Sequence, residues 1–385
     1  MQTIKQANVL RSPGARRIGV VAIQRYWSDP SSLDFDRLYL AVGRNTGNLM
    51  FTEAIFRLIE ADFHNVGFSF EPDWVNVHCD CLVIPAANWL NEYSEWDWFT
   101  ERLHQLKIPA IVIGLGLQAA SSDISHVKVN DSCRRLLDFF ASQPIPISVR
   151  GNFTRDWLRS LGIEHTVTTG CPSLYMNIFN NDHSSCGQGL IFQSTRYGLS
   201  PSFLGSDSIN RRMFDFMVDF DMPMIYQSEP EEMFLLTVQA SASTLGQPKA
   251  QLLMDLYKCH TVPELDARLT KNGKVFYDLM AWSEFVQAHW GVLGTRLHGA
   301  ILALNSGRPA ILVPHDSRTA EMASFAGIPA RLGPVVRDCQ TIDEIKALFS
   351  PDDLVRYRDI RSRNQAIFIH FLRDCGLVPN TSAMF

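Results

Sequence analysis

The pattern of hydrophobic and polar positions alternates between two periods along the whole chain. Short apolar runs rich in β-branched residues are typical of buried strands, and many are followed by amphipathic stretches with a helical period. The runs predict strands at 18–23, 37–42, 81–85, 109–113, 145–149, 166–169, 190–193, 223–226, 290–293 and 310–313. Strands that alternate with helices predict mostly parallel, doubly wound sheets, and therefore an α/β fold.

Most helical stretches fall between these strands, and two follow the last strand, one of them long. They are 51–59, 153–161, 211–220, 247–256, 275–286, 300–305, 319–325 and 352–372, with a further helix opening at the acidic segment 229–232. The last stretch has one apolar side. We expect it to pack back across the junction between two domains.

Two domains are expected because 385 residues exceed one ordinary hydrophobic core. A polar segment rich in glycine and serine near the middle of the chain is the best linker. The sequence predicts an N-terminal α/β domain at 1–180, the linker at 181–189, a C-terminal α/β domain at 190–345 and a helical tail at 346–385. Two such Rossmann-like domains would form a cleft, which is the default ligand site.

Composition and charge exclude several classes of protein. The chain is 46% hydrophobic and 19% charged, as in globular proteins, and its net charge of −5 gives no general attraction to nucleic acid or anionic membranes. No apolar run of about 18 residues occurs, and residues 1–17 have no apolar core of a secretory signal. Eight scattered cysteines suggest reduced, buried thiols. We expect a cytoplasmic protein with at most peripheral membrane association.

The strongest candidate for chemistry is the segment 294–300, GTRLHGA. It separates the strand 290–293 from a helix, so Arg296 and His298 lie at a strand-to-helix turn, where open α/β sheets bind ligands. A helix N-terminus with an arginine and a titratable imidazole suits an anionic ligand that also needs a proton moved. Two structural alternatives remain open: Arg296 in a surface salt bridge, and His298 bonded to its own backbone.

The turns after two further strands of the C-terminal domain supply more candidates. Arg196 follows the strand 190–193 and is expected to face the same crevice as Arg296. Arg318 and Glu321 follow the strand 310–313. The structural alternative for this region is a helix cap at Asp316 or Ser317 with Arg318 and Glu321 paired or solvated, and His315 is expected to be a packed loop residue.

Loops of the N-terminal domain carry the remaining candidates. Asn45, Asn48, Gln118 and Arg150 follow predicted strands and would face the cleft. For the loop 43–48 a structural alternative remains open, namely a turn with glycine at positive φ and no ligand. The GxG at 114–116 lacks the third glycine of a dinucleotide-binding fingerprint, so we exclude that function. No cluster of side chains has metal-ligand spacing, and a metal-independent protein is expected.

Three blocks of the sequence resemble the polysaccharide pyruvyl transferase family. The first, VLGTRLHGAILALNSGRPAILVPHDSRTAEM at 292–322, is similar to that family's (V/I)xGxRLHG block with its following helix, turn and strand. The second combines ISVRG at 147–151 with the segments 161–163 and 169–174, and the third is the loop 43–48. The family often has aspartate where this chain has Gly151 and Cys171, which suggests a diverged subgroup.

The resemblance implies two domains arranged as in GT-B glycosyltransferases and transfer of a pyruvyl unit from phosphoenolpyruvate to a sugar. The product is usually a ketal that bridges two hydroxyls of a lipid-linked or nucleotide-linked saccharide, made for cell-surface polysaccharides such as exopolysaccharide or capsule. No cofactor is implied beyond the donor substrate. In this reading Arg296 and His298 are catalytic. The donor would be bound by Arg196, Arg296, Leu297, His298, Gly299 and Arg318, and the acceptor by Asn45, Asn48, Gln118, Arg150 and Glu321.

Two alternative functions remain open. A GT-B glycosyltransferase that uses a nucleotide sugar would fit the positions of Arg318 and Glu321. A non-catalytic saccharide-binding relative would keep the fold and lose the reaction.

Overall fold

The computed structural model describes residues 16–25, 27, 29–119, 123–178, 187, 189–196 and 198–384. By their contacts these residues divide into two compact units. Unit 1 contains the chain up to Ala22, Ala54–Met176 and the chain from Ser362, and unit 2 contains Ile23–Glu53 and Asn177–Arg361. Each unit has parallel strands and helices, which confirms the predicted α/β class.

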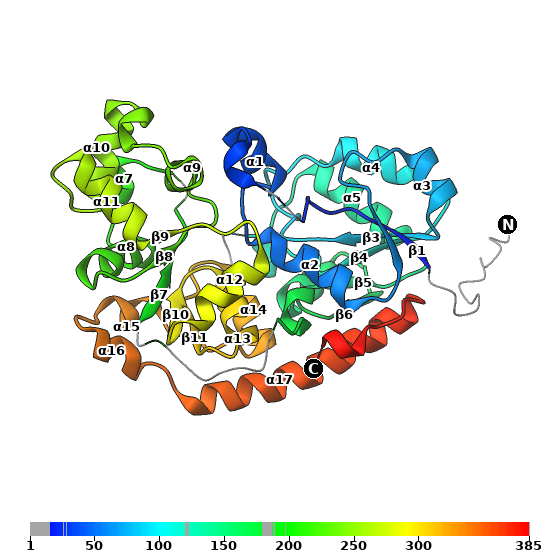
Figure 1. Cartoon of the computed structure of the whole chain (residues 1–385). Helices are drawn as coiled ribbons and strands as arrows, with labels where there is room; N and C mark the ends of the chain where they lie inside the picture. Colours follow the sequence, from blue (N-terminus) through cyan, green and yellow to red (C-terminus); the bar gives the residue numbers. More distant parts are fainter. Residues whose placement is uncertain are drawn as a thin grey trace, which may run out of the picture. The chain divides into compact units, whose positions relative to one another are not determined.

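Unit 1 is built on parallel strands in the order β2-β1-β3-β4, with the parallel pair β5-β6 beyond them (Figure 1). Leu115, just after β4, donates its N–H to the carbonyl of Ser148 on β5, which links the two groups of strands. The strands are β1 (Arg17–Val20), β2 (Asp62–Asn65), β3 (Cys81–Pro85), β4 (Ala110–Ile113), β5 (Ile147–Val149) and β6 (Thr166–Thr168). The helices wholly within unit 1 are α3 (Pro72–His78), α4 (Asp97–His104), α5 (Asp131–Ser142) and α6 (Asn152–Ser160).

The sheet of unit 1 is covered on both faces. Leu82 and Ile84 of β3 point to one face and join an apolar cluster with α3, α4 and α5. The intervening Val83, which points the other way because strand side chains alternate, is buried as well. Strands buried on both faces read as continuous apolar runs, and this is why their positions were predictable from the sequence.

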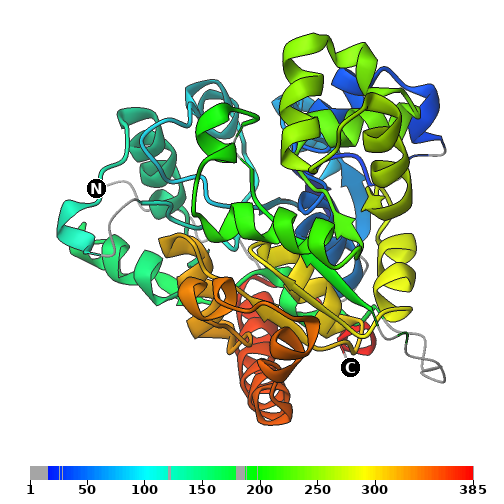
Figure 2. The same cartoon turned by 90° about the vertical axis from the view of Figure 1, so that its left-hand side faces the viewer.

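Unit 2 is built on a five-stranded parallel sheet in the order β11-β10-β7-β8-β9 (Figure 2). The strands are β7 (Leu190–Gln193), β8 (Met224–Ile225), β9 (Gly273–Lys274), β10 (Gly291–Gly294) and β11 (Ala310–Leu312). The helices wholly within unit 2 are α1 (Phe35–Ala41), α7 (Pro201–Leu204), α8 (Ile209–Asp219), α9 (Pro230–Val238), α10 (Gln247–Leu256), α11 (Val262–Asn272), α12 (Leu279–Gln287), α13 (Leu297–Asn305), α14 (Ser317–Ala326), α15 (Gly333–Arg337) and α16 (Ile342–Ala347).

The central strands of unit 2 contribute to two helical layers. Phe192, Leu293 and Ile311 pack in one apolar cluster with α8, α9 and α10. Their neighbours Ile191 and Val292 are also buried and point to the opposite face. Unit 2 is therefore doubly wound, and the carboxyl ends of β7, β10 and β11 lie at one edge of the sheet, where Arg196, Arg296 and Arg318 follow them.

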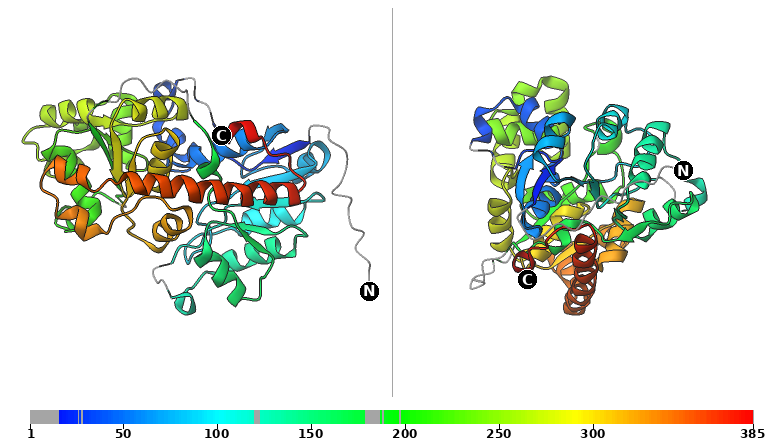
Figure 3. Two further views of the ribbon diagram at one scale, coloured as in Figure 1. Left: turned by 90° about the horizontal axis from the view of Figure 1, so that it is seen from below. Right: turned by 90° about the vertical axis from the view of Figure 1, so that its right-hand side faces the viewer.

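Two helices continue from one unit into the other along the chain. α2 (Asn48–Leu58) begins in unit 2, and α17 (Pro351–Asp374), the long red helix of Figure 3, belongs to unit 2 through Arg361 and to unit 1 from Ser362. Short 3-10 helices lie at Pro30–Ser32, Ile124–His126, Pro172–Tyr175, Ala242–Leu245 and Thr381–Ala383. Among the described helices, none is both long enough and apolar enough to span a membrane.

The prediction of a strand at 37–42 was wrong, because this stretch lies within and just after helix α1. Asp34 caps the helix by accepting a hydrogen bond from the N–H of Arg37, at 3.0 Å. Phe35 and Leu38 are buried three residues apart, while Leu40 is 57% exposed. That is a helical period, and the apolar run is too short for its period to be evident.

The predicted domain boundaries also need correction. Residues 23–53, expected in the N-terminal domain, belong to unit 2 because Phe35 and Leu38 pack in its core and Thr46 donates its N–H to the carbonyl of Gln227. The end of the predicted tail belongs to unit 1, where Phe368 stacks on Tyr175. The predicted linker 181–189 lies outside the described residues, except for positions 187 and 189.

Candidate active site

The turn between β10 and α13 is the centre of the candidate site. Arg296 occupies the N-cap position of α13 with an extended backbone, at φ −91° and ψ 113°, and its side chain does not cap the helix. The first N–H groups of α13, from Leu297 to Gly299, therefore remain at a helix end with its positive dipole. α13 has an almost wholly buried sequence, which fixes this end firmly on the sheet.

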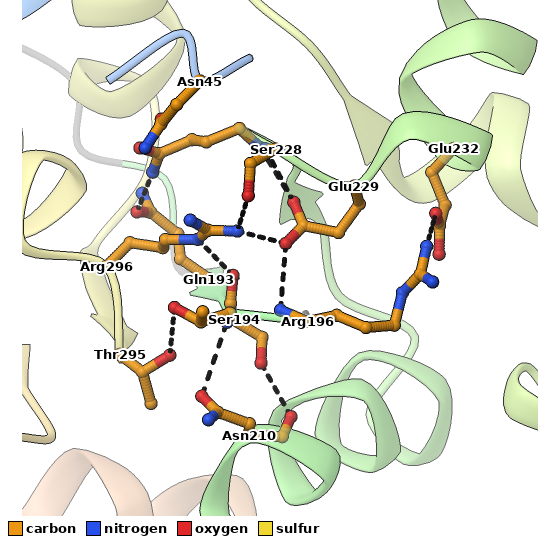
Figure 4. Close-up of polar contacts among 12 residues, drawn as sticks. Asn45, Gln193, Ser194, Arg196, Asn210, Ser228, Glu229, Glu232, Thr295 and Arg296 are labelled. Atoms are coloured by element: carbon orange, nitrogen blue, oxygen red, sulfur yellow. Dashed lines mark hydrogen bonds and ion pairs between the residues drawn. The ribbon is translucent and has the colours of Figure 1, made fainter. Parts of the chain in front are cut away.

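Glycine at position 299 lets the side chain of Gln193 lie directly against the helix. A Cβ atom at Gly299 would be only 1.5 Å from Oε1 of Gln193. That oxygen accepts a hydrogen bond of 2.9 Å from Nε2 of Gln227, so the buried amide is held between two turns of unit 2 (Figure 4). The last residue of β7 thus sets the position of the α13 N-terminus.

His298 is half-buried beside the loop that precedes α2. Its ring centroid lies 5.6 Å from that of Phe51, and a Cβ atom at Gly47 would be 3.1 Å from its Nδ1. Asn45 fixes this loop by accepting a hydrogen bond from the N–H of Gly47, at 2.8 Å. The loop 43–48, which the sequence placed in the other domain, therefore forms one wall around His298 within unit 2.

The contacts of Arg296 are buried. Its ion pair is therefore not the surface salt bridge that was the structural alternative. Its Nη2 donates to Oγ of Ser228 at 2.5 Å and to Oε1 of Glu229 (Figure 4). Its Nε donates to the carbonyl of Ser194 at 2.5 Å. Only 9% of the residue is exposed. The guanidinium is fixed between the turns that follow β7 and β8.

Glu229 accepts hydrogen bonds from residues of all three turns, those that follow β7, β8 and β10. It is 1% exposed, and besides the bond from Arg296 it accepts bonds from the backbone N–H groups of Arg196 at 3.2 Å, Gln227 at 3.0 Å and Ser228 at 3.1 Å. A carboxylate with this many donors is well compensated for its burial. From the sequence alone, the acidic segment 229–232 is expected only to suit the dipole of the helix that it opens. The sequence does contain a sign of this buried site, because Glu229, Glu231 and Glu232 stand directly before strongly apolar helical residues.

Arg196 does not face a ligand as predicted, because its side chain has no exposed surface. Its Nη2 pairs with Glu231 at 3.0 Å and with Glu232. Burial is the largest influence on the pKa of Arg196 and lowers it, but Glu232, Glu229 and Glu231 together raise that pKa above its ordinary value. Arg196 is therefore a fixed internal cation that supports the turn, with Glu229 held by its backbone N–H.

The two carboxyls that pair with Arg196 have pKa values shifted in opposite directions. Burial raises the pKa of the Glu232 carboxyl in spite of Arg196, and Oε1 of Glu232 accepts a bond from the hydroxyl of Tyr257 at 2.9 Å. For Glu231 burial also acts to raise the pKa, but Arg196 and the ammonium of Lys249, 3.0 Å away, lower it overall. The two carboxyls therefore surround one buried guanidinium.

The turn between β11 and α14 contains the helix cap that was the structural alternative for this region. Asp316 accepts from the N–H of Thr319 at 2.8 Å, in a capping box. Nη2 of Arg318 lies 3.1 Å from Oδ2 of Asp316. His315 is buried in this turn, as expected of a packed residue, and Glu321 is half-buried on α14.

The predicted acceptor residues are divided between the units. Asn48 donates from Nδ2 to the carbonyl of Val42 at 3.1 Å, so it ties the loop to the end of α1. Gln118 and Arg150 belong to unit 1. Arg150 is 2% exposed and donates to the carbonyl groups of Gly114 at 3.0 Å and Ala86 at 3.2 Å. The roles of Asn45, Asn48, Gln118, Arg150 and Glu321 toward an acceptor stay predictions.

In the part of the chain that the structure describes, no three His, Cys, Asp or Glu side chains are grouped closely enough to hold a metal ion. The chemistry that the described side chains of unit 2 offer is anion binding and proton transfer. It comes from the α13 N-terminus, the fixed Arg296 and the half-buried His298.

The family model described as polysaccharide pyruvyl transferase matches residues 26–317. No curated protein matches the chain. Similar solved structures include an uncharacterized protein from Klebsiella pneumoniae, at 13% identity and a TM-score of 0.38 over 81% of this chain and 88% of that chain. They also include two UDP-N-acetylglucosamine 2-epimerases at 10% identity.

The first epimerase, described as putative, is from Listeria monocytogenes and has a TM-score of 0.47 over 94% of this chain and 98% of that chain. The second, from Methanocaldococcus jannaschii, was solved in complex with UDP-GlcNAc and UDP. It has a TM-score of 0.44 over 91% of this chain and 99% of that chain.

Proposed function

The chain belongs to the polysaccharide pyruvyl transferase family, and on that premise we propose that it transfers the pyruvyl unit of phosphoenolpyruvate to two hydroxyls of a saccharide as a ketal. The observation that carries the proposal is the β10–α13 turn. There one short segment combines a helix N-terminus, a fixed guanidinium at Arg296 and a half-buried imidazole at His298. We assign the reaction to cell-surface polysaccharide synthesis in the cytoplasm, without a metal or further cofactor.

Phosphoenolpyruvate carries a phosphate and a carboxylate, so its site needs several donors at fixed positions. The N–H groups of Leu297, His298 and Gly299 at the start of α13 are suited to one of these anions. Arg296 adds positive charge, although Glu229 compensates part of it. Arg318 is the second cationic contact that we propose, because it follows the neighbouring strand β11 and 26% of its side chain is exposed. Arg196 acts by holding Glu229 and has no direct contact with the donor.

The reaction needs matched proton transfers. When the first hydroxyl of the saccharide adds to C2, C3 gains a proton and the hydroxyl loses one, which converts the methylene into a methyl group. The second hydroxyl then attacks C2, the bond between C2 and the phosphate oxygen breaks, and hydrogen phosphate leaves with the second proton. An imidazole titrates near neutral pH and suits this exchange. We assign the transfer of a proton to C3 to His298.

The acceptor in this proposal is a saccharide on a lipid or nucleotide carrier. The loop 43–48 beside His298 offers Asn45 and Asn48 to its hydroxyls. Gln118, Arg150 and Glu321 are the other acceptor residues that we propose. No nucleic acid partner is proposed, because the net charge of −5 gives no attraction to one.

The test of this function is release of phosphate from phosphoenolpyruvate in the presence of a panel of saccharide acceptors. His298→Ala is expected to lower turnover by about 10²–10⁴-fold, the usual contribution of a general acid or base. The matched control is His126→Ala, since that imidazole is 74% exposed and its polar contacts are with the surface residues Asp123 and Ser125 of unit 1. Wild-type turnover in His298→Ala would contradict the assigned role.

Ligand-induced thermal stabilisation separates this function from the alternatives. A ligand at a hundred times its Kd stabilises by about 2.7 kcal/mol. Phosphoenolpyruvate is expected to stabilise the full chain. Stabilisation by UDP or GDP alone would favour a glycosyltransferase, and a response only to oligosaccharides would favour a binding protein.

A further inference from the structure

His315, in the turn between β11 and α14, has hydrogen-bonding capacity that the protein does not use. Its side chain is only 9% exposed. Neither Nδ1 nor Nε2 makes a hydrogen bond of good geometry with the described residues. Buried polar groups are nearly always bonded, and leaving one unbonded costs about 1–3 kcal/mol. A buried imidazole with both nitrogens unused indicates a binding position for a polar ligand.

Two side chains of the same turn share this property. Nε of Arg318 is buried without a hydrogen-bond partner in the described part of the chain. Oδ2 of Asp316 makes no hydrogen bond of good geometry there either, but it forms an ion pair with the guanidinium of Arg318. Nε2 of His315 lies 3.8 Å from Oδ2 of Asp316, and Nη2 of Arg318 lies 3.1 Å from that same oxygen. The three side chains therefore form one cluster at the carboxyl end of β11.

This cluster lies beside the turn that carries Arg296. β10 and β11 are adjacent parallel strands, and Val313 donates its N–H to the carbonyl of Gly294 at 2.8 Å. The groups that shift the pKa of His315 include residues of both turns. Burial lowers it most, Asp316 raises it, Arg318 and Arg296 lower it further, and a weak interaction with the backbone of Val313 raises it slightly. With its pKa below the usual 6.5, the imidazole is neutral at neutral pH.

The chemistry of the cluster favours a phosphoryl group over a carboxylate. A neutral imidazole offers one N–H donor, and Nε of Arg318 offers a second. A phosphate ester has a second pKa of about 6, close to that of an imidazole, so a proton can be shared between them. A carboxylic acid, with a pKa of about 4, is too acidic to share a proton in this way.

We propose that His315 and Arg318 bind the phosphoryl group of the donor, and that His315 takes up a proton on binding and gives it to the phosphate as it leaves. The step rests on the proposed function. When the second hydroxyl attacks C2, the electron pair of the breaking C2–O bond leaves with the phosphate. The proton of His315 passes to that phosphate, and the proton of the hydroxyl returns to His315.

The test is calorimetry of the full chain with inorganic phosphate at pH 7 in two buffers of different ionisation enthalpy. The wild-type protein is expected to bind phosphate with uptake of a proton. His315→Gln keeps an N–H donor but cannot be protonated, so it should lose the uptake and bind phosphate roughly 10–100-fold more weakly. Pyruvate, a carboxylate without a phosphoryl group, should bind equally to both proteins.

The matched control is His289→Gln, in which a half-buried imidazole of unit 2 already bonded through Nδ1 to the carbonyl of Phe285 is removed. It should keep both the affinity and the proton uptake. If His315→Gln does not fold, the imidazole resonance of His315 in the wild-type protein is titrated instead, and its pKa should rise when phosphate is added. An unchanged pKa, or unchanged uptake in His315→Gln, overturns the proposal.

The outcomes separate this proposal from the function on which it rests. Phosphate binding that depends on His315, without any pyruvyl transfer from phosphoenolpyruvate, would support the phosphate site and overturn the proposed function. Pyruvyl transfer in the wild-type protein, with phosphate affinity unchanged by His315→Gln, would support the function and overturn the site.

Discussion

At the scale of single residues, three glutamates fix two of the arginines that follow the strands of unit 2. Glu231 and Glu232 hold Arg196, and Glu229 holds Arg296. A buried ion pair adds little net stability compared with apolar packing, but removing one partner leaves an uncompensated charge. The role of these glutamates is therefore to position charge at the site, and loss of either partner should be costly.

Glu229→Gln tests this positioning role. The substitution keeps the size of the side chain but removes the charge that compensates Arg296, so the free energy of unfolding should fall by about 1.5–3 kcal/mol. Urea denaturation of the two proteins measures the change. In the control, Glu164→Gln, the carboxylate is 76% exposed and 3.7 Å from Arg159, and the change should stay below about 0.5 kcal/mol. Equal effects of the two substitutions would contradict the account.

His315 gives the stability of the protein a predictable dependence on pH. Its folded-state pKa is lowered, mainly by burial, so between that pKa and about 6.5 the unfolded chain binds more protons than the folded one. Stability should therefore be lost as the pH falls below about 6.5. Thermal unfolding at pH 7.5 and 5.5 should show a smaller drop in Tm for His315→Gln than for the wild-type protein. Glu232, whose pKa is raised, acts in the opposite direction but equally in both proteins. Identical drops would refute this assignment.

At the scale of elements, the contact between β7 and α13 determines where the helix N-terminus lies. Gly299→Ala would place a methyl group on the amide of Gln193, which could move only by breaking its bond to Gln227. Because Gln193 is fully buried, its amide oxygen would then lose its hydrogen bond, and the free energy of unfolding should fall by about 1–3 kcal/mol. Denaturant unfolding measures this loss.

Two further variants control this experiment. Gly205→Ala changes the glycine that ends helix α7, where φ is −83° and a Cβ atom would come no closer than 3.6 Å to its neighbour, so it should be neutral or slightly stabilising. In the background of Gln193→Ala the Gly299→Ala substitution should cost little, since the clashing amide is gone. A full loss in that background would show that the contact with Gln193 is not the cause.

The elements show which parts of the fold the sequence determines. Strands such as β3 and β10 were predictable because burial on both faces gives continuous apolar runs. Helix α1 was not, since RLYLAV is short and apolar enough to suit either period. The polar strand β2 (Asp62–Asn65) escaped prediction because no apolar run marks it.

At the scale of the whole molecule, the order of segments along the chain does not reveal the units. Residues 23–53 belong with unit 2 through contacts to residues nearly 200 positions away, such as the bond from Tyr39 Oη to the carbonyl of Ser228. The strand-to-helix turn at GTRLHGA was predictable, because local pattern and resemblance agree there. Its glutamate partners were not, because pairings such as Arg296 with Glu229 depend on which strands become neighbours.

The central claim is that this family member joins a pyruvyl unit to a saccharide. The most direct measurement is nuclear magnetic resonance of the full chain incubated with phosphoenolpyruvate carrying ¹³C at C3 and with saccharide acceptors. The account predicts that the labelled methylene becomes a methyl group attached through a ketal to the sugar, in equal amount with released phosphate, and that His298→Ala suppresses both. Labelled phosphoenolpyruvate that stays unchanged with every acceptor, while a nucleotide sugar is consumed, would contradict it.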